Sequence, residues 1–341
     1  MKKFLKIVGI SLVVLILLII ALPFMFKGTI VEKVKEETNK MLNAKVDFGE
    51  FDLGLISTFP DFNFEIEDVS VEGVEQFEGI KLAEVKKLYL KVDLMSVIGG
   101  DQIELKTLEI TEPAIRALVL ADSTANWDIV KETPEDEPEE SSSFSLGLND
   151  LSIKGGYISY QDETSDLLAE IKGLNFNLSG DMTEASTNLS TSSTIDELNV
   201  EMDGMGYLNK AVVSAKADIE ADLANSKYTF KENEVQVNEL ILGMNGWVSM
   251  PEENIDMELT FQAKETEFKN ILSMIPAVYL TDFAQVQTKG KLALDGFAKG
   301  TYNETSLPAF ALNLVVSDAM FKYPDLPKSA NNIQVLSLIH I

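Results

Sequence analysis

FNFEIEDVSV, residues 62–71, decides the fold class, because apolar and polar residues alternate along it. Phe62, Phe64 and Ile66 occupy every second position. A period of two places these side chains on one face of a β-strand. The alternation slips by one position at residues 67–68, where we predict a β-bulge.

The same alternation continues along most of the chain. It is clear in residues 88–94 and 103–110, and a second slip at Lys106 and Thr107 predicts another bulge. Past residue 143 it returns at intervals up to residue 316. We therefore predict a mainly β fold: an N-terminal transmembrane helix followed by curved antiparallel sheets that form an elongated groove or a sandwich, with few short helices.

The apolar strand faces are the candidate ligand-binding surface. Alternation alone favours the closed core of an ordinary β-sandwich over an open groove, so both architectures remain open at this point. The residues expected to line a groove are Phe62, Phe64, Ile66, Leu88, Leu90, Val92, Leu240, Leu242, Met257, Leu259, Phe261, Leu292 and Leu294.

The segment Phe4–Phe26, upstream of the strands, predicts a membrane anchor. Residues 7–26 carry no charge, and about twenty helical residues reach roughly 30 Å, the thickness of a hydrocarbon core. The apolar run is longer than that of a signal peptide and does not end in an A-x-A-like site, so we favour a retained anchor over a cleaved signal. The anchor residues are Phe4, Ile7, Leu12, Leu15, Leu18, Leu22 and Phe26.

The charges around this segment predict its orientation. The tail before it is short and purely basic, which favours a cytoplasmic N-terminus, although Lys27, Lys33 and Lys35 reduce the contrast. We expect a single-pass membrane protein whose residues after the anchor lie outside the cytoplasmic membrane.

Composition excludes several classes of chemistry. The chain has no cysteine and its only histidine is His340, so a histidine triad, a thiolate zinc site and a histidine metal cluster cannot be built. We expect no enzymatic activity, no cofactor and no metal. The net charge is −27, and because residues 1–35 carry six Lys and one Glu, the remainder carries −32. Such a surface repels nucleic acid.

Pattern and composition also divide the chain into segments. After Val335 the chain ends in an apolar run without a turn residue, so we expect it to be a fragment of a longer protein. The expected segments are a cytoplasmic tail and anchor (1–27), a juxtamembrane helix (28–43), a first β module (44–130), an acidic Pro/Ser linker or loop (131–143), a second β module (144–265), a helix capped by Thr266 (266–280) and a further β repeat (281–341).

Four short motifs follow the expected anchor: Phe59-Pro60 before a strand, DLMSVIGG at 93–100, Pro113 opening the next strand and Asn126-Trp127 closing it. In this order they resemble the N-terminal part of the AsmA family of bacterial envelope proteins. A later piece, residues 307–335, resembles a further repeat of the family, with Tyr323-Pro324 and Leu326-Pro327 after a strand.

The resemblance implies an inner-membrane-anchored periplasmic protein, related to repeating-β-groove proteins, that acts in outer-membrane biogenesis by binding or conducting phospholipid. A lipid with two chains of about fifteen methylenes loses about 24 kcal/mol on leaving a bilayer, at about 0.8 kcal/mol per methylene. A continuous apolar groove offsets that loss, so the resemblance favours the groove over the closed core.

Two other classes remain open. One is a periplasmic structural or protein-interaction scaffold with a closed β core, whose acidic surface meets protein partners. The other is an outer-membrane barrel, which alternating strands also fit and which requires a cleaved signal.

Overall fold

The computed structural model describes most of the chain after the expected anchor, and the chain divides into two compact units. Unit 1 comprises residues 1–115 and 125–146, and unit 2 comprises residues 116–124 and 147–341. The described residues are 28, 31–33, 35–54, 58–99, 103–131, 144–145, 148–181, 185–251, 254–272, 286–303, 306–323 and 327–340.

Unit 1 is built on three long antiparallel strands, β3, β4 and β5, in that order, with β1 and β2 both paired to β3. β6 adds a short parallel pairing to β5. The elements are β1 (Ala44–Asp47), β2 (Phe51–Gly54), β3 (Asp61–Gly73), the 3-10 helix η1 (Glu75–Phe77), β4 (Lys81–Asp93), α2 (Leu94–Gly99), β5 (Ile103–Val119, of which residues up to Ile115 belong to this unit) and β6 (Phe144–Ser145).

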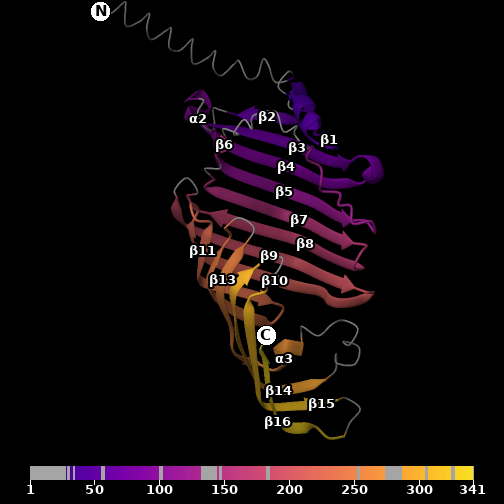
Figure 1. Ribbon diagram of the computed structural model, residues 1–341, viewed down its shortest axis with the longest axis vertical. Coiled ribbons are helices and arrows are strands. Elements are labelled where there is room, and N and C mark those ends of the chain that lie inside the picture. Colours follow the sequence, from indigo (N-terminus) through magenta and orange to yellow (C-terminus); the bar gives the residue numbers. More distant parts are fainter. Residues whose placement is uncertain are drawn as a thin grey trace, which may run out of the picture. The chain divides into compact units, whose positions relative to one another are not determined.

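Unit 2 is a meander in which each strand pairs antiparallel with the next one in the chain, as the colours of Figure 1 show. Short turns make this possible; Asp203 and Gly204, both at positive φ, form the two-residue hairpin turn after β9. The elements are β7 (Asp150–Asp162), β8 (Leu167–Ser179), β9 (Ser186–Met202), β10 (Met205–Asp222), β11 (Lys227–Val237), β12 (Leu240–Ser249), β13 (Ile255–Glu267), α3 (Lys269–Leu272), β14 (Gln287–Tyr302), β15 (Ala309–Lys322) and β16 (Ala330–His340).

The mainly β, antiparallel fold with few helices is confirmed. Residues 31–33 and 35–41, inside the expected juxtamembrane helix, are helical. The helix expected over 266–280 begins later than predicted, because Thr266 continues β13, and α3 starts at Lys269. The anchor and most of the acidic linker lie outside the described residues.

The two predicted bulges have different outcomes. Lys91 pairs with Thr107 while Val92 pairs with Leu105, so Lys106 is an extra residue and the second bulge is confirmed. The bulge predicted at Asp68 is wrong. The register between β3 and β4 is the same on either side of this residue, so no residue is inserted there.

In all three long strands of unit 1 the apolar positions shift by one residue, and the three shifts lie side by side across the sheet. The facing residues are Ile66, Leu88 and Ile110 before the change, and Val69, Val85 and Pro113 after it. Asp68 and Glu112 adopt positive φ at that level, which redirects a strand without adding a residue. Because the neighbours change together, apolar residues still face apolar residues.

Unit 2 uses glycine where backbones approach closely. Gly246 in β12 has φ +126°, and a Cβ at this position would collide with the carbonyl oxygen of Glu258 on β13. Gly243, three residues earlier, has no such constraint, because its Cβ would meet the Gln262 carbonyl oxygen at 3.6 Å. The two glycines therefore test backbone strain within one strand.

We expect Gly246→Ala to lower the free energy of unfolding by about 2–4 kcal/mol, because the new methyl group collides with backbone and the φ angle is unfavourable for alanine. Urea denaturation of the full chain in detergent measures the change. The control Gly243→Ala should be neutral or slightly stabilising. Equal effects of the two substitutions would contradict this explanation.

Candidate functional site

The main candidate site in unit 2 is one face of its sheet, on which cross-strand pairing aligns apolar residues of β7, β8 and β11 to β15. Between β8 and β11 the aligned residues are the small Ser193 and Ala215. One row of facing residues runs from β7 to β12 and another from β12 to β16. We define the apolar face by the large apolar residues of these rows and their same-face neighbours: Ile153, Phe176, Val235, Leu242, Met244, Leu259, Phe261, Leu294, Leu312 and Leu314.

Most residues of the apolar face are half-buried rather than buried. Of the described residues, Leu292 is the largest whose side chain is less than 2% exposed. It forms a small buried cluster with Val316 and Ala319, and Phe268, just before α3, packs against that cluster. The closed double layer of a sandwich would bury a far larger set of side chains.

The predicted groove residues of unit 1 also face one another. Phe62 lies opposite Val92, and Phe64 opposite Leu90. Phe62 packs with Leu94 of α2, so this end of the sheet is covered.

The pairing thus brings the predicted residues together within each unit. Four of them are buried and the other nine are half-buried. The buried ones are Phe62, Val92, Leu240 and Leu292; the half-buried ones are Phe64, Ile66, Leu88, Leu90, Leu242, Met257, Leu259, Phe261 and Leu294.

A cluster of charges closes the covered end of the unit 1 sheet. Asp61 and Asp93 face each other across β3 and β4. The Lys106 Nζ donates to Asp61 Oδ1 at 2.8 Å and to Asp93 Oδ2 at 2.6 Å. Lys91 adds a second ion pair to Asp61 at 3.1 Å. The residue that forms the bulge is therefore the one that neutralises two opposed carboxylates.

These contacts shift the protonation equilibria. Burial acts to raise the pKa of Asp61, but the hydrogen bonds from Lys106 and Lys91 outweigh it and hold the pKa below its ordinary value. The bond from Lys106, followed by the one from the Ser96 backbone N–H, lowers the pKa of Asp93. The same two carboxylates raise the pKa of Lys106.

The family-like motifs have structural positions. Pro113 is buried inside β5, directly after the change of alternation, so the prediction that it opens a strand is wrong. Asn126 is 2% exposed and Trp127 43% exposed, both after the end of β5. Phe59 and Pro60 are exposed before β3, and Tyr323 and Pro327 follow β15, with Pro324 and Leu326 outside the described residues.

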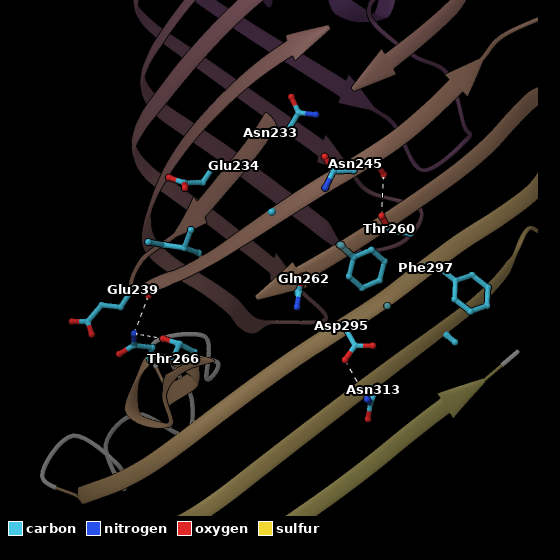
Figure 2. Close-up of a pocket in the computed structure, with 16 residues that line it drawn as sticks. Asn233, Glu234, Glu239, Asn245, Thr260, Gln262, Thr266, Asp295, Phe297 and Asn313 are labelled. Atoms are coloured by element: carbon cyan, nitrogen blue, oxygen red, sulfur yellow. Dashed lines mark hydrogen bonds between the residues drawn. The ribbon is translucent and has the colours of Figure 1, made fainter. Parts of the chain in front are cut away.

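Sequence reasoning missed a polar hollow of about 1100 Å³ in unit 2, on strands β11 to β15 (Figure 2). We call it the polar hollow. Its lining includes Asn233, Gln262, Asp295, Phe297 and Asn313. These residues lie up to 80 positions apart, and no local motif joins them. Only the strand register could have revealed it.

The expected anchor residues, from Phe4 to Phe26, lie outside the described residues. Within the described part of the chain, no helix is long and apolar enough to cross a membrane.

The fold and the site together define a class: antiparallel β proteins whose sheet presents an apolar face that no second layer buries among the residues the structure describes. The AsmA family model matches residues 1–295, so the chain belongs to the AsmA family. The match covers the N-terminal motifs, whereas all of β15 and β16, which carry the later piece, lie beyond it. No curated protein and no solved structure matches the chain.

We expect Lys106→Met to lower the free energy of unfolding by about 1–3 kcal/mol at neutral pH, because two opposed carboxylates lose their shared cation. The loss is smaller than for a fully buried pair, since Lys106 is 28% exposed. Urea denaturation measures it.

The pH dependence provides a second measurement. The pKa values of Asp61 and Asp93 are lower in the folded state than their ordinary value of 3.8. Their contribution is therefore present above that value and disappears as the pH falls through the folded-state values. The difference between Lys106→Met and the wild type should shrink in acid. The control Lys86→Met, which removes an exposed pair with Glu112, should change little; a penalty for Lys106→Met that does not change with pH would contradict the assignment.

Proposed function

We propose that this AsmA-family protein binds phospholipid acyl chains on the apolar faces of its sheets and acts in outer-membrane biogenesis. The observation that carries the proposal is the half-buried apolar face of unit 2, over which the described part of the chain places no covering layer. Membership of the AsmA family, which is generally associated with the cell envelope, also supports a function in the envelope.

The size of the apolar face suits an acyl chain. Ten strands at about 4.8 Å spacing give roughly 43 Å from β7 to β16, measured along the sheet. Each methylene taken from a bilayer into this face recovers up to about 0.8 kcal/mol. Because the side chains are already half-buried by their neighbours, a bound acyl chain would complete their burial rather than create a new core.

The proposal includes a location and a set of partners. Residues 4–26 anchor the chain in the inner membrane with the N-terminus in the cytoplasm, and the β units lie in the periplasm. The phospholipid and the membrane are the partners. The net charge of −27 argues against nucleic acid. The proposed role is binding or conduction of lipid, without catalysis and without a cofactor.

A periplasmic scaffold that contacts only proteins is the alternative. It requires another layer over the apolar face, either from this chain or from a partner. A scaffold of this kind should purify without lipid, so the same measurement separates the two functions.

We expect Leu259→Asp and Leu90→Asp each to reduce phospholipid retained after detergent purification, by half or more, because a carboxylate on the apolar face costs the desolvation of a charge. Lipid extraction and mass spectrometry measure the retained amount, and far-UV circular dichroism verifies the fold.

The matched control is Ser192→Asp, which adds the same carboxylate to the opposite, polar side of β9, facing Lys216. It should retain lipid at the wild-type level. A wild-type protein without phospholipid, or folded variants with unchanged retention, would overturn the binding proposal.

A separate prediction concerns the anchor. We expect the mature protein in cell membranes to keep residues 4–26, because the apolar run lacks a cleavage site. N-terminal mass spectrometry of membrane-extracted protein measures this directly. A mature chain beginning after Phe26 would remove the membrane tether from the proposal while leaving lipid binding open to its own test.

A further inference from the structure

The polar hollow has a regular floor made of two cross-strand rows. In the first, Glu234, Gly243, Gln262, Asp295 and Asn313 face one another in succession from β11 to β15. All five line the hollow. The register therefore assembles one continuous polar surface from five strands.

The second row lies beside the first and supplies one apolar ring. It consists of Asn245, Thr260, Phe297 and Ala311. The hydroxyl of Thr260 donates to the Asn245 carbonyl oxygen at 3.4 Å, and Figure 2 shows this contact within the hollow. Phe297 therefore has amide and hydroxyl groups beside it in this row, and Phe261, a residue of the apolar face, also lines the hollow.

Two amides in the lining have hydrogen-bond capacity to spare. Asn233 is 6% exposed; its Nδ2 donates to the Met244 carbonyl oxygen at 3.2 Å, and its Oδ1 has no partner. Asn313 donates through Nδ2 to Asp295 Oδ1 at 3.2 Å, and its Oδ1 also has no partner.

The orientation of both amides is fixed by these bonds. A carbonyl oxygen and a carboxylate only accept hydrogen bonds, so turning either amide over would set oxygen against oxygen. Each of these two oxygens is therefore buried without a donor, at a cost in free energy.

The charge of the hollow restricts the ligand. Glu234, Glu239 and Asp295 line it, and no Lys or Arg is among its lining residues. Phosphate and other anions are therefore repelled. A ligand for this surface must donate hydrogen bonds to carboxylates and amide oxygens, and must also accept them from the amide groups of residues such as Gln262.

The geometry points to a binding site for a neutral oligosaccharide in the polar hollow. Hydroxyl groups both donate and accept, which matches a lining of amides, carboxylates and the hydroxyls of Thr260 and Thr266. An aromatic ring among polar groups gives the C–H face of a sugar an apolar contact. The floor crosses four interstrand spacings, roughly 19 Å, which favours several linked sugars over one.

Gly243 offers a way to block the hollow without strain. It lies in the floor, and a Cβ there would make ordinary contacts of 3.6 Å with the Gln262 carbonyl oxygen and 3.8 Å with that of Asn233. Gly243→Leu should fold, because leucine is favoured over glycine in a strand. Its side chain would occupy the space above the first row.

The test is saturation-transfer NMR on the full chain in detergent, with maltotetraose, cellotetraose and chitotetraose as probes and with spermidine and phosphoethanolamine for comparison. We expect at least one tetrasaccharide to bind. Gly243→Leu should weaken that binding more than tenfold, and Asn313→Ala about tenfold, in line with the loss of one hydrogen-bonding group.

Asn177→Ala is the control, because Asn177 on β8 is an exposed amide outside the hollow. It faces Ser152 of β7 and Ser192 of β9. It should bind the tetrasaccharide like the wild type. Phospholipid retention by Gly243→Leu should be unchanged, which separates this site from the apolar face. The proposal is overturned if no tetrasaccharide binds, if spermidine or phosphoethanolamine alone binds, or if a folded Gly243→Leu binds as before.

Discussion

Register between hydrogen-bonded strands is the constraint on which the rest of this molecule depends. Because side chains alternate along a strand, a shift of one residue would move a strand's apolar set to the opposite face. In unit 2 the pairs Val235 with Leu242 and Phe261 with Gly296 keep that set on one side. The polar hollow depends on the same register, since its floor is the alternate set of residues from β11 to β15.

Much of the fold follows from the alternation of the sequence. Phe62, Phe64 and Ile66 predicted a strand with one apolar face, and each of them faces an apolar partner. The bulge at Lys106 was also predictable, because an inserted residue shifts the alternation within one strand. The slip at Asp68 looks the same in a single strand, and only the neighbouring strands show that the register is kept.

The candidate sites were predictable to different degrees. Predicting the apolar face requires only a hydrophobic period of two, which is visible within each short stretch of sequence. Predicting the polar hollow requires knowing which residues face each other across the strands. Gln262, Asp295 and Asn313 come from three strands, with a helix between the first two. The ion pairs of Asp61 were hidden for the same reason, since Lys106 lies 45 residues away.

The order of pairing in unit 2 also bears on how the protein acquires its structure. Every strand from β7 to β16 pairs with its neighbour in the chain, and the turns after β9 and β11 are only two residues long. Contacts are therefore local for a β protein, which favours fast folding because little loop entropy is lost before each pairing forms. A chain that emerges N-terminus first during synthesis can add one hairpin at a time to an edge that already exists. Such a protein can begin to fold before its synthesis is complete.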